Sequence, residues 1–426
     1  MIQIHKIGIL IIGFLLLSEI SDCQFVLSGE LRPRFEYRDG YKQLMNENEN
    51  PALINTQRSR LNIAYKNQNI STRFSFQDVR TWGETTTKQD IPGIHLIEAW
   101  LELFFNPHLS LKIGRQVLKY DDQRLLASTN WNNISSSHDV TLLKFNLNNF
   151  HTHLGLAYNN DMEKLTESYY PVKYYKALGY LWLSKSINEN LNISFIDIID
   201  GNQKDGSDDV IYFRKTFGSN VLFNFTDIRL KTGGNFYIQK GKGKTGTELD
   251  AYFYSANVGK YITDKLDVKI GIDYYSGNDG LDTSSLVNRA FNKLYGSGHS
   301  FCGYMDYFTS VDTNTKGGGL MDIYLTTKYT FSDKFLFQPY IHYFNLANNV
   351  AIINQHDELI AIDKYLGTEV DLTIKYLFSE VTQIDFGYSF MFATKSMETI
   401  KSGNKNGLPQ FAWIMITIKP EFFRKD

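Results

Sequence analysis

The feature that most limits what this chain can fold into is an alternation of apolar and polar residues that recurs through most of its length. In residues 369–378, Val370 and Leu372 share one face, whereas Glu369 and Asp371 share the other. A period of two residues is the signature of a β-strand whose two faces meet different surroundings. Helical periodicity is almost absent after the N-terminal leader, so the pattern predicts an all-β protein.

The connections between these segments alternate between very short turns and long loops. The short connections include 67–69, 106–108, 148–149, 263–265, 332–334 and 379–382, and the long ones are 39–56, 79–94, 117–138, 159–173, 277–318, 346–364 and 394–408. Such sorting is typical of an outer-membrane barrel, with short turns in the periplasm and long loops outside the cell. A closed barrel also satisfies every backbone group in lipid.

We therefore predict a transmembrane, antiparallel, up-and-down β-barrel of about 18 strands, because an even number places both termini in the periplasm. The predicted strands are 25–38, 57–66, 70–78, 96–105, 109–116, 139–147, 150–158, 174–185, 190–199, 210–225, 228–240, 249–262, 266–276, 319–330, 335–345, 365–378, 383–393 and 409–419. At this size we expect a lumen wide enough for water.

Composition excludes two other classes of protein. The mean hydropathy is -0.30, and no apolar run of about 20 residues, the length of a membrane-spanning helix, follows the leader. A formal net charge of -2 lacks the basic excess of a nucleic-acid binder, so no nucleic-acid partner is expected.

The N-terminal residues have the layout of a secretory signal peptide. Lys6 supplies the positive charge, and residues 7–17 form an apolar region. Small residues occupy the cleavage positions that end at Cys23. We predict cleavage after Cys23, which leaves residues 24–426 as a single outer-membrane barrel domain. The alternative is a lipoprotein signal acylated at Cys23, for which Asp22 is a poor fit.

Strand parity turns many charged residues toward the lumen if the apolar faces meet lipid. The predicted basic residues are Arg32, Arg34, Arg38, Arg58, Arg60, Arg73, Lys112, Lys144, Arg214, Arg229 and Lys231, and the acidic ones are Glu30, Glu36, Glu98, Glu102, Asp267, Asp273, Glu369, Asp371 and Asp385. We expect a polarised pore in which arginine binds carboxylates in a bidentate fork. In the alternative reading, these charges pair with one another and brace the barrel.

Aromatic residues near the strand ends predict girdles at the two lipid interfaces. These residues include Tyr37, Trp100, Phe104, Phe105, Trp182, Tyr274, Tyr275, Trp413, Phe422 and Phe423.

Several motifs resemble the alginate-export family of outer-membrane barrels, and its Bacteroidetes-type branch in particular. They are Arg58-Ser59-Arg60-Leu61-Asn62, Gly114-Arg115-Gln116, Tyr120–Leu125, His138-Asp139, Asn292–His299, Gly303–Tyr307 and Leu366–Glu369, and the resemblance covers nearly all of the mature chain. It implies an eighteen-stranded barrel that passes an anionic polysaccharide through an arginine-lined channel.

The resemblance also implies pore or constriction roles for Arg58, Arg60, Arg115 and Arg124. Arg115 shares the parity of lipid-facing residues, so it needs a bulge or a position beyond the bilayer to reach the pore. Well-known family members carry a long gating segment where this chain has only 379–382. Such a pore would leak unless loop 277–318 folds inward.

No motif points firmly to a cofactor or to catalysis. An acid-rich stretch could hold a weak calcium ion through Asp200, Asp205, Asp208 and Asp209. The calcium-loop spacing fails there, and a solvated loop is the alternative. His299 stands close to two serines, but no nucleophile elbow or ordered base surrounds it, so we do not expect an enzyme.

Two functions remain open. One is a channel for anionic polysaccharide or small anionic solutes. The other is a plugged, non-transporting barrel that serves as a scaffold for other outer-membrane proteins. Lipid and lipopolysaccharide are expected around the barrel in both cases. The sequence does not decide the cargo, the direction of transport or the oligomeric state.

Overall fold

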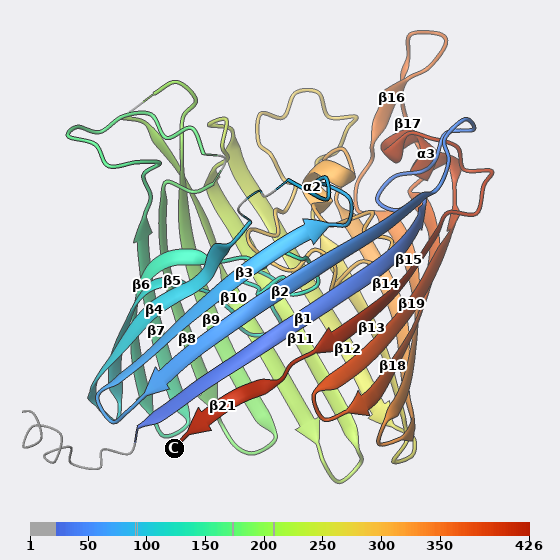
Figure 1. Cartoon of the computed structure of the whole chain (residues 1–426). Coiled ribbons are helices and arrows are strands. Elements are labelled where there is room, and N and C mark those ends of the chain that lie inside the picture. The colour runs from blue at the N-terminus through green and yellow to red at the C-terminus, as the bar shows by residue number, and fades with distance from the viewer. Residues whose placement is uncertain (1–22, 90, 92, 173, 208) are drawn as a thin grey trace, which may run out of the picture.

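The computed structural model describes residues 23–426 except 90, 92, 173 and 208. The predicted leader therefore lies outside the described residues, apart from Cys23. Figure 1 shows one closed, tilted, antiparallel barrel. Its strands are β1 (Gln24–Asp39), β2 (Ala52–Lys66), β3 (Ile70–Thr81), β4 (His95–Asn106), β5 (Leu109–Gln116), β6 (His138–Leu147), β7 (Phe150–Tyr158), β8 (Ala177–Ser186), β9 (Leu191–Gln203), β10 (Ile211–Phe225), β11 (Leu230–Lys242), β12 (Glu248–Tyr261), β13 (Leu266–Tyr275), β14 (Leu320–Ser332), β15 (Phe335–Leu346), β18 (Tyr365–Ser379), β19 (Thr382–Ala393), β20 (Gln410–Ile418) and β21 (Glu421–Lys425).

The barrel closes between its first and last strands. β1 pairs with β2 on one side and with both β20 and β21 on the other. Proline has no backbone N–H, so Pro420 interrupts the ladder between β20 and β21. These two segments are parts of one spanning strand, and the 19-stranded sheet is an 18-strand barrel. The predicted fold and strand number are confirmed.

The predicted sorting of connections also holds in the structure. Short turns gather at the end of the barrel where β1 begins and β21 ends, and long loops gather at the other end (Figure 1). The long-loop end carries elements that the sequence did not predict: the hairpin β16 (Ala351–Ile353) and β17 (Leu359–Ala361), and the helices α2 (Val311–Asn314) and α3 (Lys395–Lys401). Among the described residues, none of the helices has the length and apolar character needed to cross a bilayer.

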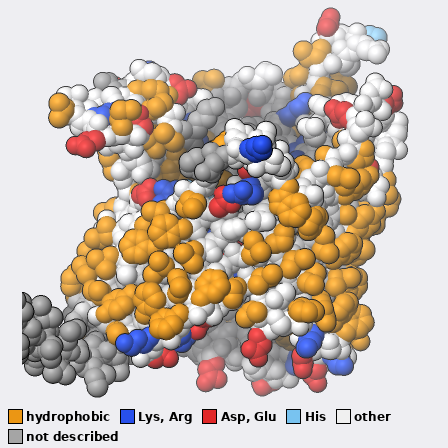
Figure 2. Space-filling model, in the orientation of Figure 1, with side chains coloured by type: hydrophobic (Ala, Val, Ile, Leu, Met, Phe, Trp, Pro, Cys, Tyr) orange, Lys and Arg blue, Asp and Glu red, His pale blue; other side chains and the backbone are white. Residues whose placement is uncertain are grey.

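The two faces of each strand are as different as the alternation predicts. Phe386 on β19 and Ile270 on β13 are 42% and 57% exposed on the outer surface, whereas Glu369 and Asp371 on β18 are fully buried inside. Figure 2 shows hydrophobic side chains over the outer face of the strands and charged side chains gathered at the short-turn rim. The apolar belt therefore faces outward.

The predicted aromatic girdles are wrong for four residues. Trp100 has the inward parity of Glu98 on β4, and its Nε1 donates a hydrogen bond to that carboxylate. Tyr275 and Trp413 are buried inside the barrel, and Trp182 donates a hydrogen bond from its Nε1 to Asp121 on a loop inside the lumen. Phe422 and Phe423 remain exposed at the short-turn rim. Strand parity, rather than closeness to a strand end, decides which aromatic side chains face lipid.

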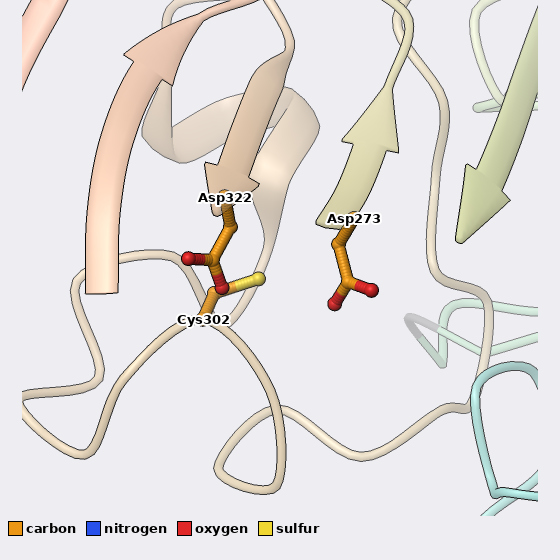
Figure 3. Close-up of side chains that lie close together, drawn as sticks. All are labelled: Asp273, Cys302 and Asp322. Atoms are coloured by element: carbon orange, nitrogen blue, oxygen red, sulfur yellow. The ribbon is translucent and has the colours of Figure 1, made fainter. Parts of the chain in front are cut away.

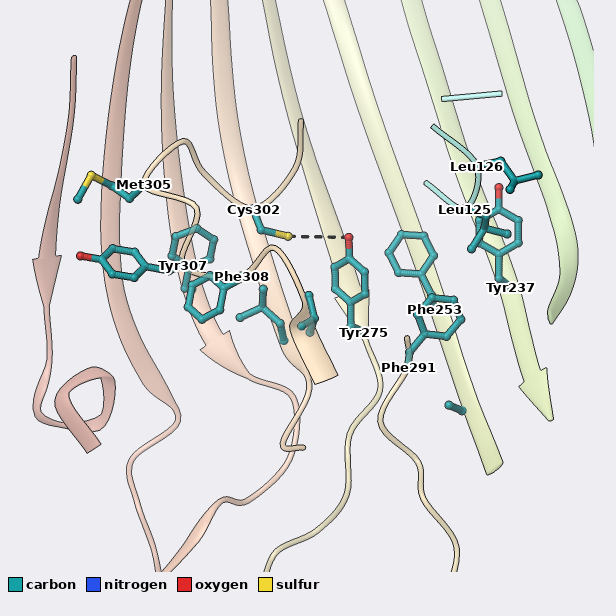
Figure 4. Packing of buried hydrophobic residues seen from close by; sticks show 14 of the residues in the cluster. Leu125, Leu126, Tyr237, Phe253, Tyr275, Phe291, Cys302, Met305, Tyr307 and Phe308 are labelled. Atoms are coloured by element: carbon teal, nitrogen blue, oxygen red, sulfur yellow. Dashed lines mark hydrogen bonds between the residues drawn. The ribbon is translucent and has the colours of Figure 1, made fainter. Parts of the chain in front are cut away.

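A hydrophobic core lies inside the barrel, where two loops pack against the wall (Figure 4). Inner loop 1 is residues 117–137, between β5 and β6, and inner loop 2 is residues 276–319, between β13 and β14. Leu126 of inner loop 1 and Met305 of inner loop 2 are both 0% exposed. The sequence left open whether 277–318 folds inward, and the structure places this loop inside the barrel. The prediction of 117–138 as an external loop is wrong, because it too enters the lumen.

Candidate functional site

The arginines of β1 and β2 hold inner loop 1 against the wall. Arg32 donates to the backbone oxygen of residue 130 at 2.6 Å, and Arg34 donates to that of residue 131 at 2.7 Å. Arg58, which is 0% exposed, donates to the oxygen of residue 132 at 3.1 Å. Because a backbone carbonyl is an obligatory acceptor, these contacts satisfy a loop that runs without a sheet of its own. We call Arg32, Arg34 and Arg58 the basic wall.

The basic wall is only partly neutralised by acids of its own strands. Arg58 Nε bonds Glu30 at 2.6 Å, and Arg34 Nε pairs with Glu36 at 2.7 Å. Arg38 also pairs with Glu36. Arg32 has no carboxylate oxygen within 4.0 Å in the part of the chain that the structure describes. The alternative of mutually bracing charges thus describes Arg34, Arg38 and Arg58 but not Arg32.

Two further arginines line the lumen beside the basic wall. Arg60 donates to Gln77 Oε1 at 2.5 Å and to Ser135 Oγ of inner loop 1 at 2.8 Å. Arg73 pairs with Glu98 across 3.0 Å. These contacts leave Arg60 without a carboxylate partner among the described residues.

The opposite side of the lumen is acidic and holds inner loop 2. Glu369 Oε1 accepts the N–H of Met305 at 2.7 Å, and Asp371 Oδ2 accepts that of Tyr304 at 3.4 Å. Gly303 directly precedes these two residues; its φ is 82°, and a Cβ there would sit 2.3 Å from Glu369 Oε1. Only glycine fits a left-handed backbone that approaches a carboxylate so closely. We call Glu369 and Asp371 the acidic wall.

The acidic side continues on β13 and β14, next to Arg124 of inner loop 1. Arg124 binds Asp273 through two nitrogens, with Nη2 to Oδ1 at 2.8 Å, and also donates to Tyr275 Oη at 3.0 Å. His342 Nδ1 lies 3.0 Å from Asp322 Oδ1. Inner loop 1 is therefore bound to both sides of the lumen, by its carbonyls on one side and by Arg124 on the other.

Asp273, Cys302 and Asp322 bring three potential metal-ligand atoms within 4.8 Å of one another (Figure 3). Two of the three are poor ligands. Arg124 already occupies both oxygens of Asp273, and burial raises the pKa of the Cys302 thiol to about 12, which keeps it protonated. We therefore describe these residues as part of the loop anchorage.

The two inner loops are joined to each other. Tyr295 donates its backbone N–H to Leu125 O at 3.0 Å and accepts that of Ala127 at 3.1 Å. The rings of Trp131 and His299 stack with centroids 3.9 Å apart and planes 7° from parallel. The loops therefore form one constriction between the two walls.

A buried carboxylate orients His299 in that stack. Asp306 Oδ1 lies 2.8 Å from His299 Nδ1, and Tyr41 Oη donates to its other oxygen at 2.5 Å. Burial alone would raise the pKa of Asp306, but His299 and the Tyr41 hydrogen bond outweigh it and lower that pKa below its ordinary value. The carboxylate form is thus the one that the constriction favours.

Two more of the predicted pore residues face the lumen, at different heights of the barrel. Arg214 is buried against Asp200, with Nη2 and Oδ2 2.8 Å apart. Lys231 lines the short-turn half of the lumen and donates to Tyr261 Oη at 2.7 Å.

Two predicted pore residues need correction. Arg115 pairs with Asp139 across 3.1 Å on the outer surface, since β5 and β6 pair without a register shift and the lipid-side parity therefore holds. Arg229 lies in the turn before β11, with φ 55°, and pairs with Asp264 of the neighbouring turn at 2.7 Å. It is a residue of the rim rather than of the wall.

The predicted calcium ligands do not form one group in the described residues. Asp200 is buried on β9 and bound to Arg214, whereas Asp205 accepts a hydrogen bond from Tyr169, and Asp209 one from Ser207. Asp208 lies outside the described residues. The weak calcium site stays a prediction.

Below the constriction, on the short-turn side, the lumen is open. A cavity of about 520 Å³ adjoins one of about 280 Å³, and both are lined by Leu222, Asn257 and Lys269. The smaller cavity reaches Tyr304 of inner loop 2 and His342 of β15. A solute of small size can therefore reach the lower surface of the constriction.

Sequence reasoning missed four residues of this site. Asp322 and His342 are inward-facing residues on regular strands, so parity was the signal that would have found them. His299 was considered only as a catalytic residue, and Asp306 only as part of a family motif. Neither lies on a strand, so no parity signal exists for them.

The comparisons with known proteins agree with this architecture. The model of the alginate export family matches residues 24–158. That segment holds Arg58, Arg60 and Arg124, so the predicted resemblance is confirmed there, although the match is shorter than the predicted one. A comparison with curated proteins gave no match.

Solved structures with the same fold include three outer-membrane proteins. Acinetobacter baumannii OccAB1 is 14% identical with a TM-score of 0.63, covering 94% of this chain and 97% of that one. Pseudomonas aeruginosa OpdL is 10% identical with a TM-score of 0.62, and Pseudomonas aeruginosa OpdK with vanillate is 11% identical with a TM-score of 0.60; each covers 94% of this chain and 99% of its own. At these identities the likeness concerns the fold.

An 18-strand barrel with an apolar belt and a lumen narrowed by inward loops defines an outer-membrane β-barrel of the porin type. Over residues 24–158 this barrel matches the alginate export family.

Proposed function

We propose that this protein is an outer-membrane channel for solutes that carry an anionic group, either small solutes or segments of an acidic polysaccharide. One observation carries the proposal: the arginines at the constriction bind neutral backbone carbonyls of a loop. Hydrogen bonds between arginine and a carboxylate are charge-assisted and stronger than those to a carbonyl. An anionic solute therefore competes with inner loop 1 for the basic wall.

Two further observations support this function. Arg32 and Arg60 face the lumen without a carboxylate partner among the described residues, so they attract anions from solution. The related structure of OpdK contains vanillate, which is itself a carboxylate. We assign the short-turn end, with both termini, to the periplasm, and the apolar belt to contacts with lipid and lipopolysaccharide.

A planar bilayer tests the proposal with the purified full-length protein. We expect single-channel currents whose reversal potential in a salt gradient shows a preference for anions, and block by an added polyuronate. The absence of current with correctly folded, heat-modifiable protein would rule out the channel function. Cation-selective current would exclude the anionic cargo.

An arginine variant links the current to the basic wall. Arg60→Gln removes one lumen charge that has no carboxylate partner among the described residues, and we expect it to lower the anion preference. Lys334→Gln removes one charge from an exposed turn between β14 and β15 and serves as the matched control. An equal effect of both variants contradicts a role for Arg60 in selectivity.

A plugged scaffold is the second candidate function, and the anchored loops favour it. Inner loops 1 and 2 are bound to both walls and to each other, which leaves a constriction rather than an open pore. A scaffold predicts no conductance and the co-purification of defined outer-membrane partners. The bilayer experiment therefore separates the two candidates.

A further inference from the structure

A row of inward-facing residues crosses neighbouring strands in the short-turn half of the lumen. In the sheet register, Lys231 of β11 pairs with Gly259 of β12, and Gly259 pairs with Lys269 of β13. All three line the cavity of about 520 Å³. Neighbouring strands are about 4.8 Å apart, so the α-carbons of the two lysines are about 10 Å apart, with the glycine between them.

Neither lysine is neutralised by the protein. Lys231 Nζ donates to the phenol of Tyr261 at 2.7 Å. Within the described residues, no carboxylate oxygen lies within 4.0 Å of Lys231 Nζ or Lys269 Nζ, although Glu189 and Asp267 line the same cavity. Because Lys328 also lines the cavity, its three ammonium groups outnumber its two carboxylates, and the excess of positive charge attracts an anion.

The glycine keeps the space between the lysines open. A Cβ at Gly259 would lie 3.4 Å from Lys269 Cβ and 3.6 Å from its Cγ, which is ordinary contact, so the position tolerates alanine. Any longer side chain there enters the gap. The amide side chains of Asn224 and Asn257 line the same cavity and offer further N–H donors.

We propose that Lys231, Gly259 and Lys269 form a binding site for one oxyanion group, a carboxylate or a phosphate, on the short-turn side of the constriction. The inference rests on the proposed function in one respect: the oxyanion belongs to the cargo. Lysine holds anions as a hydrated point charge, without the fixed fork of arginine. Such a site concentrates the solute and still releases it, as a conduction path requires.

Trifluoroacetate is the probe for this site, observed by ¹⁹F relaxation with the full-length protein in detergent. We expect it to bind, and trifluoroacetamide, its neutral counterpart of similar shape, not to bind. In Lys231→Gln/Lys269→Gln we expect the affinity to fall by about tenfold or more, because two charged interactions are lost. Lys334→Gln is the control and should match the wild-type protein.

Changes at the glycine test the geometry of the site. Gly259→Glu places a carboxylate between the two lysines and should abolish binding, whereas Gly259→Ala should stay within about twofold of wild type, because its Cβ is accommodated. Heat modifiability checks that each variant is folded. If trifluoroacetate binds equally to the double lysine variant and to Gly259→Glu, the site is excluded.

Displacement of the probe identifies the oxyanion. We expect glucuronate or glucose 6-phosphate to displace trifluoroacetate, and glucose not to; the stronger competitor shows which group the site prefers. Displacement by none of the three contradicts the proposal.

The outcome is independent of the bilayer result. A silent bilayer with intact trifluoroacetate binding rejects the channel but keeps the site. An anion-selective channel without this binding rejects the site alone.

Discussion

The basic and acidic walls fix the two inner loops in opposite chemical senses. The basic wall uses long side chains that donate to backbone carbonyls of residues 130–132, and the acidic wall uses short side chains that accept backbone N–H groups of residues 304–305. Arginine reaches its loop from a distance, whereas a carboxylate needs the loop backbone pressed against it at Gly303. Inner loop 2 is therefore held closer to its wall, whereas inner loop 1 is the one for which an anionic solute would compete under the proposed function.

The largest expected effect is at Gly303, where the acidic wall leaves no room for a side chain. In Gly303→Val the Cβ would meet Glu369 Oε1 at 2.3 Å, on a backbone with φ 82°. We expect destabilisation of about 3 kcal/mol or more, measured as a lower heat-modification midpoint. Gly407→Val is the control, because no other part of the described chain lies within 4 Å of a Cβ there. Equal midpoints for both variants would show that the loop is not pressed against the wall.

The second prediction concerns the loss of one arginine from the basic wall. Arg34→Ala removes the bond to residue 131 and the guanidinium that lies 4.3 Å from the Trp131 ring centroid. We expect inner loop 1 to loosen by about 1 to 3 kcal/mol and the single-channel conductance to rise. The control is Arg80→Ala, which removes an exposed arginine that also pairs with an acid, Asp78. An unchanged conductance in Arg34→Ala contradicts the role of the basic wall in holding inner loop 1.

The third prediction uses the lowered pKa of Asp306 to sharpen the comparison. A carboxylate whose pKa is lowered by folding stabilises the fold at pH values above its ordinary pKa of about 3.9. It loses that contribution as the pH falls through the lowered pKa. Between pH 7 and about 4.5 we therefore expect no change in the anchorage of inner loop 2. Below about pH 4 it should weaken, measured as a fall in the heat-modification midpoint.

Asp306→Asn is the matched variant for this prediction. Without the carboxylate, the heat-modification midpoint should lie below that of wild type above pH 4, and the difference between the two proteins should shrink as the pH falls further. A constant difference down to the lowest pH would show that Asp306 does not titrate with the anchorage.

The smallest expected effect is at Arg115, outside the lumen. Because its partner is Asp139 and both side chains are solvent-accessible on the outer surface, Arg115→Ala should change stability by no more than about 0.5 kcal/mol. The reversal potential in a salt gradient should equal that of wild type. A shift in selectivity would place Arg115 in the pore after all.

Strand periodicity predicted most of the fold. The bounds of β5 and β7 agree with the predicted 109–116 and 150–158 to the residue, because each lies between two turns or loops with clear polar signals. Parity also placed Glu369 and Asp371 inside and Phe386 outside. Where parity and a family motif disagreed, at Arg115, parity was right.

The constriction could not be predicted to the same degree. The path of inner loop 1 depends on bonds between its backbone and arginines about a hundred residues away, and no local pattern in 117–137 reports those bonds. The sequence predicted that these arginines face the lumen. It did not predict that they donate hydrogen bonds to backbone carbonyls of a loop. Side chain to backbone contacts across a lumen leave no periodic signal in either partner.

The break at Pro420 has a consequence for how the ring is joined. The seam connects segments nearly 400 positions apart, and the entropy cost of bringing such ends together rises only slowly with their separation. Its two parts differ in strength, since β20 pairs with both β19 and β1, whereas β21 is a five-residue segment with every residue exposed. The ring is therefore held shut mainly by the nine residues of β20, and β21 extends the same seam to the short-turn end through its pairing with β1 alone.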